Sequence, residues 1–172
     1  MNSNQLISSW YEELGTTIFT YIYMNTKDYH SAEDILQEVF LKAYKNYDTF
    51  KGHSSFKTWI FSIAQNTTID YLRKKNILKH FMELTFNERD SSPLPEQIMQ
   101  LNDDELHLHH ALQTLKLDFR QVILLRKIKC FSTKETAEIL GWSENRVKTN
   151  LKRGLVELKK QLIIGGFEYE GI

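Results

Sequence analysis

Two helical patterns, 134–140 and 144–162, meet at a tight break, and this feature most constrains what the chain can fold into. Gly141 lies at the break and tolerates the positive φ that commonly ends a helix, because it has no Cβ. Ser143 is a suitable N-cap for the second helix, and Glu144 places an acid in its first turn. The pattern predicts a helix-turn-helix.

The second of these helices separates apolar from polar side chains at the period of 3.6 residues. The stripe that would pack inward consists of Val147, Leu151, Leu155, Leu158 and Leu162. The outward face carries long cations and short hydrogen-bonding groups, namely Asn145, Arg146, Thr149, Lys152, Arg153 and Lys160, with Lys148 on its flank. Such groups read base edges or bind phosphates in a major groove, so the face predicts a DNA-reading helix. The alternative is an ordinary solvated surface.

The composition suits one or two compact helical domains. The 172 residues are 41% hydrophobic and 26% charged, which is enough apolar material for real cores. The single cysteine, Cys130, excludes an intramolecular disulfide, and we expect it to be a small buried filler. No apolar run approaches the roughly 20 residues that cross a bilayer, and the N-terminus lacks a secretory signal. We therefore expect a cytoplasmic protein without membrane insertion.

The net charge of zero hides a segregation of charge along the chain. Residues 111–162 hold 12 Lys and Arg against 5 Asp and Glu, whereas residues 83–110 hold 1 against 7. Residues 1–82 hold 9 against 8, and residues 163–172 hold 2 acids. A basic block beside an acidic connector is typical of a module that binds a polyanion, next to a segment that does not.

The first half of the chain predicts three helices, at 4–24, 31–47 and 56–75, with a polar loop at 48–55. Ser31, with Asp34 three residues later, has the form of a capping box for the second helix. The expected inner faces are Ile7, Trp10, Leu14, Ile18 and Ile22, then Ile35, Leu36, Val39, Phe40, Ala43 and Tyr47, then Phe56, Trp59, Ile60, Ile63, Ala64, Thr67 and Tyr71.

Aromatic residues lie beside cations in and after the loop at 48–55. This combination suits a site where unstacked bases lie on rings while phosphates meet ammonium groups. Aromatics at helical spacing are more often core, so we expect Phe56 and Trp59 to be at least half buried. The pattern alone leaves both interpretations of this loop open.

Residues 83–104 contain both prolines and several acids but no sustained period, which predicts a flexible linker between two all-α domains. The domains would span 1–82 and 105–164, followed by a tail at 165–172. In the second domain, ahead of the helix-turn-helix, we expect helices at 105–116 and 119–129, the latter with Arg120, Arg126, Lys127 and Lys129 on its basic side.

Metal and catalytic motifs are weak or absent in the sequence. His107 and His110 share a helix face near acids, but two such ligands are only half of a structural zinc site, so we expect no metal. No nucleophile elbow, phosphate-binding glycine loop, paired-cysteine motif or HExxH occurs. We therefore expect a protein that is not an enzyme and that has no cofactor and no small-molecule substrate.

Three ordered segments of the chain resemble the extracytoplasmic function (ECF) group of bacterial RNA polymerase sigma factors. They are SAEDILQEVFLKAY, SSFKTWIFSIAQNTTIDYLRKK and LQTLKLDFRQVILLRKIKCFSTKETAEILGWSENRVKTNLKRGLVELKKQL. The resemblance covers about residues 6–75 and 106–162. Three motifs in order are far more specific than a lone helix-turn-helix.

The resemblance implies that the first domain is sigma region two and the second is region four. The helix beginning near Ala32 would dock on the clamp of the polymerase β′ subunit through Asp34, Gln37, Glu38 and Leu41. The minus-ten element would be melted and read by a loop of Phe50, Lys51, His53, Ser54 and Ser55, and by a flanking face of Lys57, Asn66, Asp70 and Arg73. Region four would read the minus-thirty-five element with Lys148, Thr149, Lys152 and Arg153, which overlap the outward face found from periodicity.

The partners implied by the resemblance are core polymerase, through its β′ clamp and β flap, promoter DNA, and an anti-sigma factor. A stand-alone helix-turn-helix regulator is the competing interpretation; it accounts for the C-terminal half but not for the loop and aromatic-rich helix at 49–75. A pure protein-interaction module is a further alternative, although it would not need a reading face.

Overall fold

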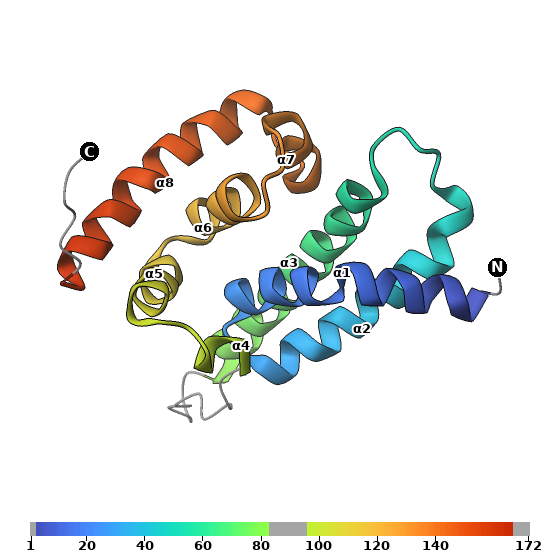
Figure 1. The fold of residues 1–172 in the computed structure, drawn as a ribbon, viewed down its shortest axis with the longest axis horizontal. Coiled ribbons are helices and arrows are strands. Elements are labelled where there is room, and N and C mark those ends of the chain that lie inside the picture. Colours follow the sequence, from blue (N-terminus) through green and yellow to red (C-terminus); the bar gives the residue numbers. More distant parts are fainter. Residues whose placement is uncertain (1–2, 83–95, 167–172) are drawn as a thin grey trace. The chain divides into compact units, whose positions relative to one another are not determined.

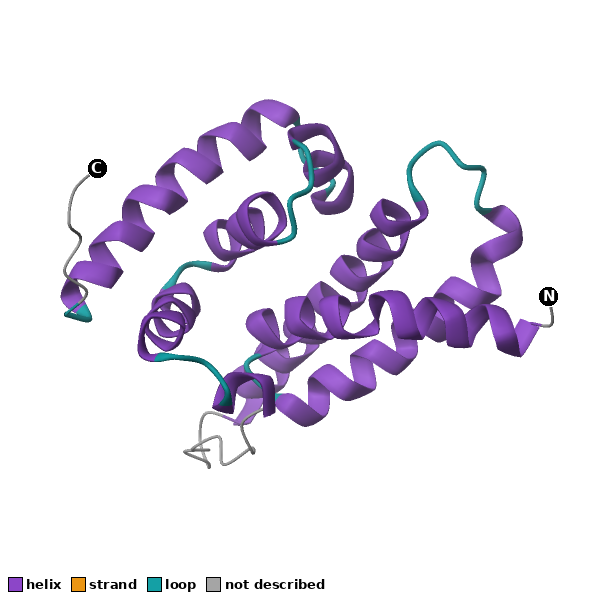
Figure 2. Ribbon diagram, in the orientation of Figure 1, coloured by secondary structure: helices purple, strands orange, loops and turns teal. Residues whose placement is uncertain are grey.

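The computed structural model describes residues 3–82 and 96–166, and the elements within these ranges are helical (Figures 1 and 2). The chain divides into two compact units, Met1–Pro93 and Leu94–Ile172. No strand occurs in the described ranges, so the predicted all-α fold is confirmed. Each unit has its own buried apolar core.

Three long helices form the first unit: α1 (Ser3–Thr26), α2 (Tyr29–Asn46) and α3 (Phe56–Met82), with a short 3-10 turn, η1 (Tyr47–Thr49), after α2. Each long helix packs on the other two. The core contains Trp10, Leu14, Ile18 and Ile22 of α1, Ile35, Leu36, Val39, Phe40 and Ala43 of α2, and Ile60, Phe61 and Ala64 of α3. The predicted inner faces are therefore largely confirmed, with the exception of Tyr47, which is exposed in η1.

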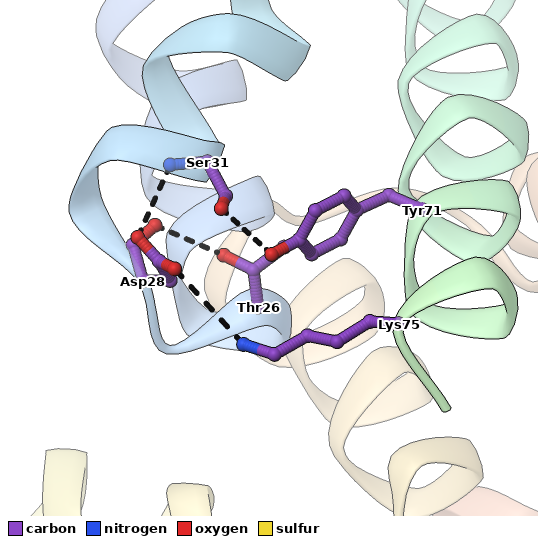
Figure 3. Close-up of polar contacts among 5 residues, drawn as sticks. All are labelled: Thr26, Asp28, Ser31, Tyr71 and Lys75. Carbon is purple, nitrogen blue, oxygen red and sulfur yellow. Dashed lines mark hydrogen bonds and ion pairs between the residues drawn. The ribbon is translucent and has the colours of Figure 1, made fainter. Parts of the chain in front are cut away.

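The start of α2 differs from the predicted capping box. Its N-cap is Asp28, whose side chain accepts a hydrogen bond from the backbone N–H of Ser31 at 3.1 Å. The Ser31 hydroxyl instead shares a 2.6 Å hydrogen bond with the Tyr71 hydroxyl of α3, and Lys75 of α3 lies 4.0 Å from the Asp28 carboxylate (Figure 3). The prediction of Ser31 as N-cap is wrong because its hydroxyl bonds to another helix, while Asp28 caps α2 three residues earlier.

A buried polar contact also joins α1 to α3. The hydroxyl of Tyr21 donates to Oε1 of Gln65 at 2.6 Å, and the amide of Asn25 donates to the Tyr21 carbonyl at 2.8 Å. All three residues are buried, so these hydrogen bonds replace the ones that the polar groups make to water in the unfolded chain. The contact therefore specifies how α3 lies against α1.

The third helix runs past its predicted end at 75 to Met82, because no glycine or proline interrupts the sequence there. Its last turns expose Ile77, Leu78, Phe81 and Met82. Of the predicted linker at 83–104, residues 83–95 lie outside the described ranges. Within its described part, a short helix α4 (Glu96–Met99) and the first residues of α5 replace the expected coil.

The second unit contains α5 (Asp103–Thr114), α6 (Leu117–Ile123), η2 (Leu124–Ile128), α7 (Thr133–Leu140) and α8 (Glu144–Ile164). Helix α8 packs against α5, α6 and α7. α5 begins before its predicted start because the side chains of Asn102 and Glu105 form a reciprocal capping box. Of the predicted tail at 165–172, only Gly165 and Gly166 are described, in a turn that ends α8. The core of the unit contains Ala111, Leu112, Leu115, Val122, Ile123, Leu124, Leu125, Phe131, Ala137, Ile139, Val147 and Leu158.

The helix predicted at 119–129 is not a single α-helix. After α6 the chain widens into the π-helical turn η2, where the N–H of Lys129 donates to the carbonyl of Leu124 at 2.8 Å. Cys130 follows with φ of 60° and is exposed. The expectation that Cys130 fills the core was wrong, because this residue lies in the reversal between η2 and α7 and not on a helix face.

Arg120 lies in the core, contrary to its predicted place on a basic outer side. It is 5% exposed, and its Nη1 donates to the carbonyl oxygens of Gln113 at 3.2 Å and Leu115 at 3.1 Å. These carbonyls belong to the C-terminal end of α5, where the helix itself supplies no donors. Arg126 similarly donates to the carbonyl of Phe131, whereas Lys127 is exposed as predicted.

The stability of the second unit should fall at acidic pH because of His109. Burial, and secondarily the charge of the neighbouring His110, lowers the pKa of His109 below the ordinary imidazole value of 6.5. The unfolded chain then binds this proton at a higher pH than the folded chain, so stability is complete above pH 6.5 and declines as the pH falls below it. Hydrogen exchange in α5 between pH 7.5 and 5 should reveal this decline. His109→Gln should flatten it, while His107→Gln, on the exposed side of the same helix, should leave it in place; an unchanged profile in His109→Gln would contradict the assignment.

Candidate nucleic-acid interface

The turn between α7 and α8 has the geometry of a helix-turn-helix. Ser132 caps α7, with its hydroxyl accepting from Glu135 N–H at 3.1 Å and the Glu135 carboxylate accepting from Ser132 N–H at 2.7 Å. Gly141 ends α7 with φ of 65°, and the next N–H donates to the Ala137 carbonyl at 2.9 Å. Ser143 then caps α8, accepting from the N–H at position 146 at 3.2 Å. The predicted break and both of its capping residues are confirmed.

The outward face of α8 is exposed, as predicted. Asn145, Lys148, Thr149, Lys152 and Arg153 are all exposed, and none of their side chains has a hydrogen bond or ion pair with another residue in the described ranges. Their donors are thus available to an external acceptor. We refer to these five residues as the reading face.

The inward stripe of α8 differs from its prediction at one position. Val147 and Leu158 are buried and Leu151 and Leu162 are half-buried, but Leu155 is exposed. The buried residue of that turn is Gly154. Val147, Gly154 and Leu158 share a helix face, since residues seven and eleven apart lie on one side, but the spacing alone does not show that α6 packs at Gly154.

At Gly154, α6 approaches α8 closely. A Cβ at this position would lie 3.1 Å from Cβ of Phe119 and 3.1 Å from Cδ1 of Ile123. Because Gly154 has no side chain, Phe119 and Ile123 of α6 can pack directly on the backbone of α8. Sequence reasoning gave this glycine no role.

Arg146 was predicted to belong to the outward face of α8, but its side chain has partners within the protein. Its Nη2 lies 3.1 Å from Oδ2 of Asp118 on α6, in a hydrogen-bonded ion pair. Its guanidinium also stacks over the indole of Trp142, 4.0 Å from the ring centroid. Arg146 therefore differs from its exposed neighbours in having two partners.

The loop predicted to capture a minus-ten base is exposed around one glycine. Lys51 and His53 are exposed, and Gly52 has φ of 70°, which favours glycine. The Ser55 hydroxyl accepts from the N–H of Thr58 at 3.1 Å, so it is used to cap α3, and Ser54 is half-buried.

An aromatic cluster lies next to this loop. Its rings are Trp10, Tyr47, Phe50, Phe56 and Trp59, with centroids 4.6 Å apart for Trp10 and Phe56 and 4.9 Å apart for Phe50 and Trp59. Phe56 and Trp59 are half-buried, as predicted. Phe50 belongs to the loop but packs on Trp59 and Phe56, so the cluster anchors one end of the loop to α3.

The flanking face predicted on α3 falls into two parts. Asn66, Asp70 and Arg73 are exposed and follow one another along one side of the helix, where Arg73 lies 3.7 Å from Asp70. Lys57 is also exposed, but it is nine residues from Asn66, which is two and a half turns, so it points to the opposite side. The structure therefore brings three of the four residues together.

The predicted docking face of α2 is exposed along the helix. Asp34, Gln37, Glu38 and Leu41 all lie outside the core, and Leu41 is 57% exposed although it is apolar. Glu38 forms an ion pair with Lys42 at 2.7 Å. A single exposed leucine is common on protein surfaces, so docking through this face stays a prediction.

His107 and His110 have no third candidate metal ligand beside them among the residues that the structure describes. His107 and His110 are both exposed on α5, and residues 3–82 and 96–166 contain no group of three or more His, Cys, Asp or Glu side chains that could hold an ion. Within the same ranges, the helices are too short or too polar to cross a membrane.

Comparison with known proteins matches both halves of the chain to one family. Sigma-70 region 2 matches residues 10–77, and Sigma-70, region 4 matches residues 106–158. The ECF RNA polymerase sigma factor SigX of Bacillus subtilis is 35% identical, over 88% of this chain and 81% of SigX. The RNA polymerase sigma factor YlaC of the same organism is 33% identical, over 94% of this chain and 95% of YlaC.

Two solved structures share the fold. The sigma factor RpoE in complex with the anti-sigma factor NepR from Bartonella quintana has a TM-score of 0.76 at 24% identity, covering 91% of this chain and 98% of the matched chain. CnrH in complex with the cytosolic domain of CnrY has a TM-score of 0.68 at 20% identity, covering 94% and 90%. With both regions present in order and full-length relatives above 30% identity, the chain belongs to the ECF group of the sigma-70 family of RNA polymerase sigma factors.

Proposed function

We propose that this sigma factor binds core polymerase through the α2 face, reads the minus-thirty-five element with α8, and opens the minus-ten element with the loop at 50–55 and α3. The observation that carries the proposal is that the side chains of the reading face have no partners in the described ranges, on the second helix of a helix-turn-helix whose two helices are both N-capped. The second unit supplies a helix for the major groove, and the first supplies an exposed loop next to stacked rings.

The proposal includes partners of three kinds. Relatives are named as RNA polymerase sigma factors, and the structures that share the fold are named as complexes with an anti-sigma factor or with the partner CnrY. For this chain we infer core polymerase, contacted at the β′ clamp and the β flap, promoter DNA, and an anti-sigma factor. The protein acts in the cytoplasm as an initiation factor that catalyses no reaction itself and needs no cofactor.

The two units divide the work between them, with boundaries at 1–82 and 105–164. The acidic stretch 83–110 opposes DNA phosphates, and the reading face is small, so the free protein should bind DNA weakly. Core polymerase holds both units and adds its own DNA contacts, which raises the effective concentration of each unit at its element. Specific binding therefore depends on the complex.

Strand opening needs a site for a base that has left the duplex. Unstacking costs on the order of a few kcal/mol per step, and capture of the freed base offsets that cost. Lys51 and His53 are exposed in the loop, while Phe50 holds the loop against Trp59. Asn66 and Arg73 would then line the path of the phosphate backbone along α3.

In vitro transcription with purified core polymerase tests the proposal. The complex should start transcription at specific promoters only when this protein is present, and the protein alone should not protect the same DNA. Tight operator binding without polymerase would instead favour a stand-alone regulator, and an absence of both activities would refute the proposal.

Arg153→Ala should weaken initiation only at promoters with an intact minus-thirty-five element. Arg153 is exposed without a partner in the described ranges, so its removal costs DNA contacts and leaves the fold intact. We expect a loss of about 1–3 kcal/mol in open-complex formation on such promoters. Lys127→Ala removes an exposed cation away from the reading face and is the control. An equal loss on promoters without the element would show that Arg153 does not read bases.

A further inference from the structure

We propose that Arg146 is a positioning residue that, together with Asp118 and Trp142, orients the recognition helix and does not itself contact DNA. This inference rests on the proposed function, because it concerns how α8 reads the minus-thirty-five element. It assigns specificity to Asn145, Lys148, Thr149, Lys152 and Arg153, and it gives Asp118 a role although Asp118 lies on another helix.

The first argument is the occupancy of the Arg146 side chain. Its guanidinium has an ion-pair partner 3.1 Å away in Asp118 and an aromatic partner 4.0 Å away in Trp142. One face of the guanidinium and one of its nitrogens are thus engaged before any DNA arrives. A planar guanidinium stacks and pairs at the same time, which a lysine does not do.

The second argument is the position of Arg146 on the helix. Asn145, Thr149 and Lys152 form the middle of the outward face, and Arg146 lies at its margin, one residue from the buried Val147. The side chain crosses from that margin to α6. It therefore leaves the reading face at the turn of α8 that would enter the groove first.

The third argument is that Asp118 and Phe119, adjacent in α6, hold α8 at two separate points. Phe119 packs on Gly154, where an added Cβ would lie 3.1 Å from its own Cβ. Asp118 pairs with Arg146, eight residues earlier on α8, which is about 12 Å along the helix axis. One contact fixes the distance between the helices, and the second fixes the direction in which the first turn of α8 points.

The test measures binding of the polymerase complex to promoter DNA with an intact or scrambled minus-thirty-five element, for Asp118→Asn, Arg146→Gln and the double variant. Removing an acid near DNA should strengthen binding if charge alone matters. The positioning role predicts the opposite: each single variant should lose about threefold to tenfold of the preference for the intact element. The double variant should lose no more than Arg146→Gln alone, because Arg146→Gln already removes the contact with Asp118 as well as the stack on Trp142.

Salt dependence separates this role from a phosphate contact. Arg146→Gln should leave the slope of log affinity against log salt unchanged, whereas Lys152→Gln should lower it by about one. Arg146→Lys should resemble Arg146→Gln, since a lysine keeps the charge but not the stack on Trp142. Thermal unfolding of each variant checks that the unit remains folded, and Asp118→Asn provides the test if an Arg146 variant does not fold.

Three outcomes would overturn the inference: a lower salt slope in Arg146→Gln, additive losses in the double variant, or stronger specific binding in Asp118→Asn. These are distinct from failure of the proposed function, in which the unaltered protein would direct no initiation with core polymerase at any promoter.

Discussion

Leu41→Asp should abolish binding to core polymerase while leaving the first unit folded. Leu41 is 57% exposed on α2, so it contributes little to the core, and a charged residue is tolerated there in the free protein. In the proposed complex the leucine would be covered by the polymerase clamp, and an aspartate would bury an unpaired carboxylate. Loss of an interface hot spot costs at least about 2 kcal/mol, and the buried charge adds to this, so we expect affinity to fall by about 100-fold or more.

Ile77→Asp is the matched control for this prediction. Ile77 is 52% exposed in the same unit, but it lies on α3 and outside the proposed docking face. Titration of fluorescently labelled core polymerase with each variant gives the two affinities directly. Nearly equal affinities for Leu41→Asp and the unaltered protein would show that α2 does not dock, whereas equal losses in both variants would point to a nonspecific effect of an added charge.

Arg120→Ala should destabilise the second unit by about 3 kcal/mol. The substitution removes the donor of two hydrogen bonds that satisfy carbonyls at the end of α5, and hydrogen bonds to charged groups contribute about 1.5–3 kcal/mol. It also leaves space in a core where Arg120 is 5% exposed. Hydrogen exchange of α5, α6 and α8 in the full-length protein should quicken by about 100-fold if these helices open as one unit.

Arg153→Ala is the natural comparison, because it removes the same side chain from the exposed face of α8. We expect its effect on stability to remain within about 0.5 kcal/mol. The substitution of Arg120 should thus lower the stability of the second unit, whereas the substitution of Arg153 should weaken promoter binding and leave stability nearly unchanged. Slow exchange in Arg120→Ala, close to that of the unaltered protein, would mean that α5 needs no external donor at its end.

Several features of the fold follow from local sequence alone. The capped turn at Ser132, Gly141 and Ser143 was predictable because each residue satisfies a backbone requirement of its immediate neighbours. The stripes of α1 and α2 were predictable because apolar residues recur at the helical period. The exposed reading face follows from the same period, since residues opposite a buried stripe remain outside.

The predictions that were wrong, at Ser31 and Leu155, failed because they depend on contacts between helices. Periodicity treats each helix alone, so it could not show that Ser31 bonds to Tyr71, because these residues are forty positions apart. Nor could it show that Leu155 is exposed while Gly154 is buried, because that depends on where Phe119 meets α8. When a side chain contacts a neighbouring helix, the periodicity of its own helix does not predict that contact.

Local sequence is enough to predict the helices and the helix-turn-helix, because hydrogen-bonding caps and the spacing of apolar residues act within a few turns of one helix. The three ordered motifs that resemble the ECF group predict the family. Only packing shows which arginine side chains are engaged within the protein. Arg120, Arg146 and Arg153 all carry the same charge in the same basic stretch. Arg120 donates to carbonyls at the end of α5, and Arg146 pairs with Asp118 and stacks on Trp142. The side chain of Arg153 has no partner in the described ranges. The availability of a cation depends on partners that packing brings to it, and these lie elsewhere in the chain.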